Sequence, residues 1–509
     1  MNANQLSGIL IADAQYENPR TSPTRAIGAH RIASLMRRRN VHVEVLDFFN
    51  SWEIDELLAF LNNFGKIDFL GISMGVGKID IKKVTTLIEN IKTIYPNLKI
   101  IVGGSNVTEA KFPQVDYYFK GFADGAIDDI LKYLTTGKIN PFMVEHVKTH
   151  DTKKIIDCDK HYLKFDLSNL KTEYTENDFI IANEALPLEA SRGCVFQCMY
   201  CDFPLVGKKK NDYIREKEDI KSELISNYEK WGSTIYVLTD ATFNDNVAKL
   251  DMMHEITKEL PFKPQYVCFT RIDLLHSRPG TLEKMIDMGI KAMFLGIETF
   301  STETSKVIRK PFTGDKLKNY ILEIRNKYPD LHLTGSFIVG LPGESFDMIK
   351  NNLDWAIQHK LFDSVITFPL AIQLDNGVNY VSPFSKDWQN HGYINMSIEE
   401  SEKFLEENKH YLIKEKKLNL TELKKHYVFW KSTDMNVFQA EYYATEIRKM
   451  YAEYNSISAF GCFDLSFSGI PLHTLLKSPK TTLNWDYIKS EATRFVNEYK
   501  QKKLMIKFN

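Results

Sequence analysis

The sequence predicts an α/β protein with two successive parallel β-sheets and a mostly helical C-terminal extension. In residues 8–137, short apolar runs alternate with amphipathic segments at the spacing of a doubly wound sheet. From residue 186 the alternation resumes with a longer repeat, and six such units suffice for a partial (βα)6 barrel. Beyond about residue 380 the pattern becomes irregular and rich in aromatic residues. The expected divisions are 1–137, a linker at 138–185, 186–380 and 381–509.

Composition limits the class of protein. A chain of 509 residues is too long for one hydrophobic core, and its 43% hydrophobic and 26% charged residues are ordinary for a soluble globular protein. A formal net charge of −1 provides no overall field to attract nucleic acid or an anionic membrane. The first residues lack the basic and apolar regions of a signal peptide, and no run of about eighteen apolar residues exists. We therefore expect a cytoplasmic protein that binds neither nucleic acid nor membranes.

The N-terminal part is expected to be a doubly wound sheet. Its predicted strands are 8–12, 42–46, 68–73, 98–102 and 116–120, and its predicted helices are 24–39, 52–63, 79–95 and 125–136. Ligands of such sheets bind beyond the carboxyl ends of the strands. The loops expected there are 13–15, 73–75 and 103–105, together with Gly121. Residues 138–187 are polar and weakly periodic, as in a linker, and the isolated Cys158 is interpreted as a packing residue.

The second βα series fits a partial barrel. Its predicted strands are 188–191, 234–238, 265–269, 292–297, 334–339 and 365–368, and its predicted helices are 216–231, 246–260, 280–288, 314–327 and 345–359. In βα barrels the active residues lie on loops after the carboxyl ends of the strands. The loop after the first strand is therefore a candidate site.

That loop contains three cysteines, Cys194, Cys198 and Cys201, spaced by four and then three residues. Three thiolates this close can converge on one soft metal centre, which favours a reducing compartment. A structural zinc ion takes four ligands and most iron–sulfur clusters take four cysteines, so a cluster held by three has one iron open to another ligand. The alternatives are a zinc knuckle completed by a distant His and three unrelated core cysteines.

The Cys-x3-Cys-x2-Cys pattern, with Tyr200 before its last cysteine, closely resembles the cluster loop of radical S-adenosylmethionine (SAM) enzymes. The resemblance implies a [4Fe–4S] cluster whose open iron chelates SAM, with reductive cleavage of SAM to a 5′-deoxyadenosyl radical. It also implies an external electron donor, such as a flavodoxin or ferredoxin, and a small-molecule or biosynthetic-intermediate substrate.

The next two strand ends are interpreted through the same resemblance. Asp240 lies in an Asp-x-x-Phe turn similar to one in the cobalamin-associated branch of the family, which implies that it accepts from the amine of SAM, with Asn244 adding a hydrogen bond. The alternative is an Asx-turn that caps the next helix. Arg271 has a guanidinium that can hold a carboxylate through two hydrogen bonds, and its alternative role is an ion pair with Asp273.

The fourth and fifth strand ends carry the most specific matches. The turn at 296–300 closely resembles the family's Gly-x-Glu-Ser turn, which implies that Glu298 accepts from the amine or ribose of SAM. Residues 337–344 match a Gly-Leu-Pro-Gly-Glu turn, which implies close approach of the Gly340 backbone to the adenine. Glu344 is placed to cap the following helix by its charge, and Ser336 is expected to point into the barrel.

The N-terminal sheet resembles the cobalamin-binding, flavodoxin-like domain that precedes the barrel in many radical SAM enzymes. Ser73, Gly103 and Gly104 match positions that receive the nucleotide tail of cobalamin. Gln15 and Asn18 replace the His and Gly of the cobalt-ligating loop, so cobalt ligation by this loop is not expected. The turn at 121–125 also departs from the family's Gly-Glu-Gly-Glu. The alternative is a retained scaffold without cobalamin.

The C-terminal extension is expected to close one side of the open barrel and to shape the substrate pocket. Helices are predicted at 398–416, 421–455 and 481–500, with a strand or loop at 460–467. Its aromatic residues at helical spacing are interpreted as core. Cys462 is interpreted as a buried thiol rather than as a radical quencher or substrate contact.

The function predicted from these resemblances is that of a cobalamin-dependent radical SAM methyltransferase acting at an unactivated carbon or phosphorus. A second hypothesis keeps the radical chemistry without cobalamin, giving an oxidation, a rearrangement or a carbon–sulfur bond, and the altered 121–125 turn favours it. A third is a non-catalytic or nucleic-acid-binding iron–sulfur protein. The near-zero net charge and the lack of an interleaved basic and aromatic stripe weigh against it.

Overall fold

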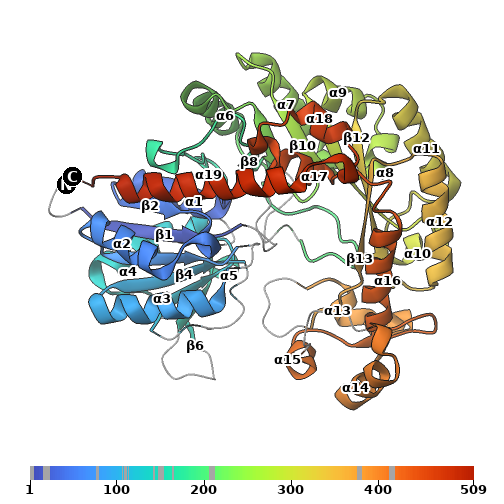
Figure 1. The fold of residues 1–509 in the computed structure, drawn as a ribbon, viewed down its shortest axis with the longest axis horizontal. Coiled ribbons are helices and arrows are strands. Elements are labelled where there is room, and N and C mark those ends of the chain that lie inside the picture. Colours follow the sequence, from blue (N-terminus) through green and yellow to red (C-terminus); the bar gives the residue numbers. More distant parts are fainter. Residues whose placement is uncertain are drawn as a thin grey trace.

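The computed structural model describes most of the chain: residues 5–14, 23–75, 79–105, 107, 112, 114–140, 144–146, 154–162, 166–203, 205, 212–374, 381–411 and 419–508. An N-terminal α/β layer lies beside a curved sheet surrounded by helices, and the last long helix runs from the barrel back along the N-terminal layer (Figure 1). The two sheets are those expected, in the expected order along the chain.

The N-terminal sheet has seven described strands in the order β2-β1-β3-β4-β5-β7-β6. Its strands are β1 (Ser7–Ala12), β2 (His42–Leu46), β3 (Phe69–Ser73), β4 (Lys99–Gly104), β5 (Tyr117–Lys120), β6 (Val144–His146) and β7 (Lys154–Asp157). β1 to β5 pair in parallel in the flavodoxin-like order 2-1-3-4-5. Every residue of β1 is buried, as expected for a central strand covered on both faces.

Helices cover both faces of this sheet. They are α1 (Ile27–Arg37), α2 (Ile54–Phe64), α3 (Ile81–Ile94) and α4 (Ile127–Thr136). The apolar residues of α1 and α4 share one core cluster with one face of the strands, and those of α2 and α3 share another with the opposite face. A reciprocal capping box between Glu53 and Glu56 begins α2, and Gly137 ends α4 in the left-handed conformation.

The segment expected as a linker contributes to the N-terminal sheet. β7 pairs in parallel with β5, β6 pairs antiparallel with β7, and α5 (Cys158–His161) follows directly. Only Ile155 and Ile156 are apolar in β7, which is too short a run to stand out as a strand in the sequence. Cys158 is 1% exposed and packs in the core.

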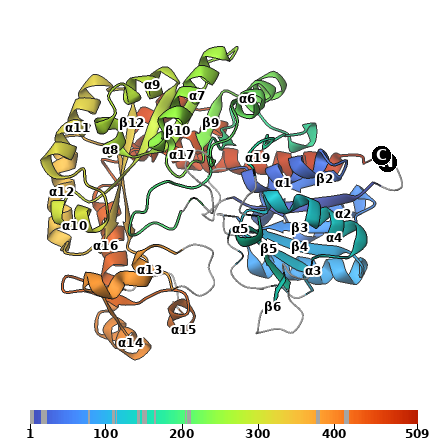
Figure 2. The same ribbon diagram turned by 180° about the vertical axis from the view of Figure 1, so that it is seen from behind.

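The barrel sheet has six parallel strands in the order β13-β12-β11-β10-β9-β8. They are β8 (Leu186–Leu188), β9 (Ile235–Leu238), β10 (Gln265–Thr270), β11 (Ile290–Glu298), β12 (His332–Val339) and β13 (Ser364–Pro369). The covering helices include α6 (Lys217–Trp231), α7 (Val247–Glu259), α9 (Thr281–Asp287), α11 (Gly314–Lys327) and α12 (Phe346–Gln358). Figure 2 shows α9, α11 and α12 around the outside of the strands.

The C-terminal part differs from the prediction in three places. The helix predicted at 421–455 is α15 (Leu420–Lys424), the short strand β15 (Trp430–Lys431) and α16 (Val437–Met450), because β15 pairs with β14 (Ile394–Asn395) and Asn436 caps a new helix. The helix predicted at 398–416 is α14 (Ile398–Glu407), followed by a turn. The strand or loop predicted at 460–467 is mostly a helix, α17 (Ala459–Asp464), with a Ser458 cap.

Two C-terminal helices, α17 and α19 (Trp485–Met505), pack against the two sheets' domains. α17 packs against β9 to β12 on the face opposite the covering helices, because its apolar residues share a core cluster with Ile235, Val267 and Ala292. α19 packs against α2 of the N-terminal layer. No described helix is long and apolar enough to cross a membrane.

Candidate active site

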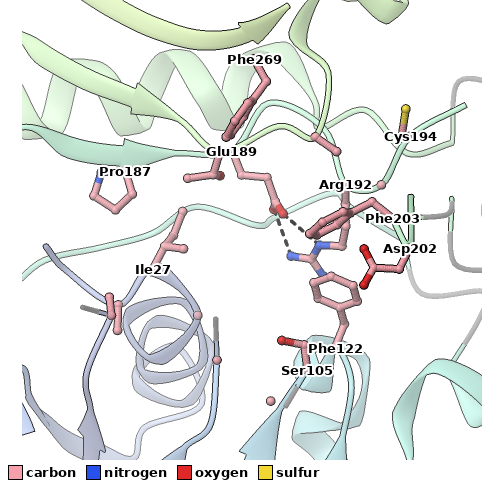
Figure 3. A pocket seen from close by; sticks show the side chains of 18 of the residues that line it. Ile27, Ser105, Phe122, Pro187, Glu189, Arg192, Cys194, Asp202, Phe203 and Phe269 are labelled. Atoms are coloured by element: carbon pink, nitrogen blue, oxygen red, sulfur yellow. Dashed lines mark hydrogen bonds and ion pairs between the residues drawn. The ribbon is translucent and has the colours of Figure 1, made fainter. Parts of the chain in front are cut away.

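A cavity of about 1140 Å³ lies between the barrel and the N-terminal layer. It is lined from one side by the carboxyl ends of the barrel strands and from the other by those of β3, β4 and β5. Figure 3 shows Phe269 entering from the barrel, with Ser105 and Phe122 on the N-terminal layer. The two sets of strand ends expected to carry function therefore face one space.

The cysteine loop follows β8 and forms one wall of this cavity. Cys194, Cys198 and Cys201 all line it, whereas the other three cysteines do not. The preceding residues are held by backbone hydrogen bonds from Arg192 N to Tyr213 O (2.8 Å) and from Arg215 N to Ala190 O (2.9 Å). Burial raises the pKa of the Cys201 thiol to about 12, and the neighbouring cysteines add to the increase.

No group of three or more His, Cys, Asp or Glu side chains in the described residues is arranged to hold a single metal ion. A single zinc ion needs all its ligand atoms within about 2.3 Å of one point. In a four-iron cluster each thiolate binds its own iron, so the three sulfurs stand further apart. The three thiols on one cavity wall are the donor set that a cluster with one iron open to another ligand requires.

Arg271 reaches the cysteine loop from the end of β10. Its Nη1 lies 3.4 Å from Cys198 Sγ, and the guanidinium lies 3.9 Å above the Phe196 ring. It also makes two hydrogen bonds to Asp273, from Nε (3.0 Å) and Nη2 (2.7 Å). The carboxylate that accepts both hydrogen bonds from Arg271 is thus that of Asp273, while the third nitrogen, Nη1, contacts the sulfur of Cys198. The ion pair with Asp273, which was the alternative role of Arg271, is present, and a contact of Arg271 with SAM stays a prediction.

Glu298 lies in the cavity wall at an irregular strand end. The register between β11 and β12 shifts between Gly296 and Glu298, and Glu298 has a φ of +66°. Its Oε1 accepts from Tyr200 Oη (2.8 Å) and Lys310 Nζ (3.0 Å). Its Oε2 has no hydrogen-bond partner among the described residues. A carboxylate anchored through one oxygen therefore presents the other to the cavity.

Asp240 differs from the expectation of a SAM-binding acceptor. It is fully buried behind the cavity wall and is not among the lining residues. Its oxygens accept from Ala190 N (2.9 Å), from the Ser191 hydroxyl and from Lys249 Nζ (3.2 Å). The ammonium that Asp240 binds therefore belongs to Lys249. Asn244 is also buried and makes two hydrogen bonds to the backbone of Arg271.

The turn after β12 is also built differently from the expectation. Gly340 does not line the cavity, and a Cβ on it would lie 2.4 Å from Cη2 of Trp430. Its φ of +99° and this close approach give it a packing role. Ser345 caps α12, and Glu344 is buried against Thr299. Ser336 lines the cavity, as expected for a side chain pointing into the barrel.

The N-terminal strand ends form a cradle of small residues. Ser73, Gly103 and Gly104 line the cavity, and Ser73 pairs with Gly103 across β3 and β4. A Cβ on Gly104 would lie 2.3 Å from Met74 O, and its φ of +130° excludes most side chains. Gln15 and Asn18 lie outside the described residues.

The cavity continues from this cradle into the N-terminal layer. Leu10, Gly71 and Ile101, in the middle of β1, β3 and β4, line its inner end together with Met36 of α1. A side chain at Gly71 would fill this space, because its Cβ would lie 2.3 Å from Leu10 Cδ2. The result is an apolar slot between the sheet and α1 that opens into the main cavity.

A charged network missed by sequence reasoning joins the two halves. Arg192, in the cysteine loop, donates to Asp124 (2.8 Å) and Glu189 (3.0 Å), and Glu189 also pairs with Arg31 of α1. Figure 3 shows Glu189 and Arg192 paired beside Phe122, whose ring lies 4.4 Å from the guanidinium carbon. The Ser-Arg-Gly-Cys run can be seen in the sequence, but only the fold brings Asp124 to Arg192 and Arg31 to Glu189.

Comparisons with known proteins agree with this architecture. Residues 188–356 match the family described as the radical SAM superfamily. A tRNA-2-methylthio-N(6)-dimethylallyladenosine synthase from Natranaerobius thermophilus is 27% identical over 297 residues, which cover 56% of this chain and 61% of that protein. The chain spans about half to three fifths of the length of the first curated relatives it matches.

Two solved structures share the fold over most of the chain. One is the radical SAM methyltransferase TsrM from Kitasatospora setae with cobalamin and a [4Fe–4S] cluster bound, at a TM-score of 0.55 and 12% identity, covering 77% of this chain and 76% of TsrM. The other is the cobalamin-dependent SAM radical enzyme OxsB with aqua-cobalamin and SAM bound, at a TM-score of 0.52 and 14% identity, covering 88% of this chain and 61% of OxsB.

Proposed function

We propose that this chain, which carries a radical SAM domain, is an enzyme that cleaves SAM reductively and transfers a methyl group to an unactivated centre with the help of cobalamin. The observation that carries the proposal is the single cavity joining the three cysteines to the glycine cradle of the N-terminal sheet. A small-molecule substrate and an external electron donor complete the proposal.

Cys194, Cys198 and Cys201 are the proposed ligands of a [4Fe–4S] cluster. They fit because three thiols on one wall leave one iron of the cluster without a protein ligand. When bound, the cluster supplies the electron that cleaves SAM. Arg271 places a positive charge against Cys198 and stacks on Phe196 of the same loop.

The proposed SAM contacts are Tyr200, Glu298, Arg271 and Ser336, which all line the cavity. Glu298 is the strongest of them, because Tyr200 and Lys310 fix one of its oxygens and leave the other to accept from an amine or a ribose hydroxyl. Asp240 and Gly340 are omitted from this set, because the first is neutralised by Lys249 and the second packs against Trp430.

Cobalamin is proposed at the cradle formed by Ser73, Gly103 and Gly104. The fit rests on the absence of side chains where the cavity opens and on the apolar slot behind it, lined by Leu10 and Ile101, which suits a flat base at the end of a nucleotide tail. When bound, cobalamin supplies a methyl carrier. Arg192, which donates to Asp124 and Glu189, connects the cysteine loop to the N-terminal layer beside this cradle.

The proposal is tested by anaerobic reconstitution with iron, sulfide and hydroxocobalamin. We expect about four irons and one cobalt per chain, with conversion of SAM to S-adenosylhomocysteine and 5′-deoxyadenosine under reduction. Cys198→Ala should abolish iron retention, whereas the matched control Cys158→Ala, at a buried cysteine away from the cavity, should keep it. A wild-type protein that binds no iron would contradict the whole proposal.

A second candidate keeps SAM cleavage but lacks cobalamin. The turn at 121–125 favours it, because the Asp159 carboxylate lies where a Cβ on Gly121 would stand and accepts from Phe122 N (2.9 Å), so this turn packs against α5. The curated relative named above is a methylthio-group enzyme for tRNA, and a methylthio group contains a carbon–sulfur bond. Iron without cobalt, with 5′-deoxyadenosine as the only SAM-derived nucleoside, would favour this candidate.

A further inference from the structure

Inside the barrel, part of the wall of the 1140 Å³ cavity is formed by α17 rather than by a barrel strand. Phe460 and Asp464, one turn apart on this helix, both line the cavity that contains the three cysteines. α17 is fixed by a hydrogen bond from Ala459 N to Thr334 Oγ1 (2.8 Å) on β12. These two side chains are therefore held rigidly on the inner side of the barrel.

Asp464 is one of two carboxyl groups in the cavity wall, with Asp202 beside Cys201, to which no other described residue donates a hydrogen bond. Glu189, Glu298 and Arg271 all have partners within the protein. Asp464 has no hydrogen bond or ion pair with any residue that the structure describes. Burial alone raises the pKa of its carboxyl to about 7. An unpartnered carboxyl in an apolar wall costs folding free energy, which is typical of groups that bind a ligand.

The surface beside Asp464 is aromatic. The Phe460 ring centroid lies 4.3 Å from that of Phe269 and 5.9 Å from that of Phe294. Phe269 and Phe368 are 36% and 45% exposed although they lie in a cavity wall, so their rings are available to a ligand. A flat apolar body lying on these rings would bury them, and the carboxylate lies on the same helix face as Phe460.

We infer that α17 recognises the substrate of the proposed reaction, which is a small cyclic or aromatic molecule carrying a basic amine. The ring would pack on Phe460 and Phe269, and the ammonium would donate to Asp464. The inference rests on the proposed function, since it assigns the substrate class of the same site. An RNA substrate is disfavoured, because the basic lining residues that the structure describes, Arg25, Arg31, Arg192, Arg271 and Lys310, are all paired with acidic side chains.

The test compares three probes with one ring system: tryptamine, 3-ethylindole and indole-3-propionate. Their dissociation constants are measured by calorimetry at pH 8 on protein reconstituted with iron, sulfide and hydroxocobalamin. We expect tryptamine to bind roughly 10- to 100-fold more tightly than 3-ethylindole, because one charge-assisted hydrogen bond has that effect, and indole-3-propionate to bind most weakly. Asp464→Asn should remove this preference, and Phe460→Ala should weaken all three probes.

Asp363→Asn is the matched control, because Asp363 is paired with Arg325 away from the cavity; it should leave the preference for tryptamine unchanged. Equal affinities for tryptamine and 3-ethylindole in the wild type, no binding of any probe, or an unchanged preference in Asp464→Asn would overturn the inference. SAM cleavage and cobalt content are measured on the same preparation. A protein that cleaves SAM but does not distinguish the probes refutes the substrate class alone, and one that does neither contradicts the proposed function.

Discussion

At the scale of single residues, the cavity depends on side chains that the backbone holds in uncommon ways. Glu298 adopts a positive φ at a register shift, a conformation that residues other than glycine rarely adopt. A Cβ on the neighbouring Gly296 would lie 2.7 Å from Glu298 Oε1 and 2.9 Å from Lys310 Nζ. The carboxylate is thus positioned by the strand end, by Tyr200 and by Lys310 together.

Replacing Glu298 by Gln should weaken SAM binding roughly 10- to 100-fold, because a hydrogen bond to a charged group contributes about 1.5–3 kcal/mol. The dissociation constant of SAM, measured by equilibrium dialysis on the iron-reconstituted protein, checks this. Glu303→Gln, at an exposed position of α10 (Thr302–Val307), is the control and should bind like the wild type. Unchanged affinity in Glu298→Gln would remove this residue from the SAM site.

Asp464 should make stability depend on pH. Its pKa is raised from an ordinary value of 3.8 to about 7 in the folded state, so the folded protein binds more protons than the unfolded chain between these values. The contribution of this carboxyl to the unfolding free energy is fully favourable below pH 3.8 and is lost as the pH rises through about 7. Asp464→Asn should therefore raise the unfolding free energy by about 1–3 kcal/mol at pH 8, and by less at pH 5.

Thermal unfolding at the two pH values measures this difference. Asp363→Asn is the contrasting variant, because Asp363 accepts from Arg325 (2.6 Å) and Leu333 N (2.7 Å) and should destabilise the fold. A lower melting temperature for Asp464→Asn at pH 8 would mean that the carboxylate has a stabilising partner.

At the scale of elements, the strand ends were largely predictable and their side-chain partners were not. Alternating apolar runs place β1 to β5 and β8 to β13 within a few residues, whereas β6, β7, β14 and β15 were not predicted. A motif at or after the end of a parallel strand must lie at the carboxyl edge of the sheet, as Cys194 and Glu298 do. Asp240 follows β9 in the same way, but whether it faces the cavity depends on Lys249. The spacing of residues along the chain does not predict that Asp240 pairs with Lys249.

Gly103→Val should block the cradle proposed for cobalamin without straining the backbone. An added Cβ would lie 3.5 Å from Phe119 O, an ordinary contact, and the larger side chain would extend into the cavity. We expect cobalt per chain to fall about tenfold or more, which corresponds to about 1.4 kcal/mol or more of lost binding, while iron per chain is retained.

Elemental analysis after reconstitution and desalting measures both metals. The control is Thr135→Val on the exposed side of α4, which adds a branched apolar side chain away from the cradle. Equal cobalt content in Gly103→Val and the wild type would place any cobalamin elsewhere.

At the scale of the whole molecule, the C-terminal helices hold the two halves together. Lys503 of α19 is fully buried and pairs with Glu44 of β2 (3.0 Å) and Asp178 (3.8 Å), and Tyr499 Oη accepts from Asp47 N (3.0 Å). The periodicity of residues 481–500 predicted this helix but not its location. Which distant surface a helix covers is decided by pairs of residues more than 400 positions apart, such as Glu44 and Lys503.

Lys503→Met should destabilise the folded chain by about 3–5 kcal/mol, because it removes a buried cation from beside the two buried carboxylates of Glu44 and Asp178. Urea unfolding followed by circular dichroism checks this. The matched control is Lys502→Met, whose exposed neighbouring side chain should change stability by less than about 0.5 kcal/mol. Similar unfolding midpoints for the two variants would show that α19 is held by its apolar contacts alone.

The position of α17 late in the chain has a consequence for biosynthesis. A nascent polypeptide that has emerged from the ribosome only as far as β13 has all six barrel strands, but Ile235, Val267 and Ala292 still lack the helix that covers them. A cofactor that bound during translation would enter a cavity still open on the side that α17 covers. The cavity is therefore complete only after residues 459–464 have been synthesised and docked.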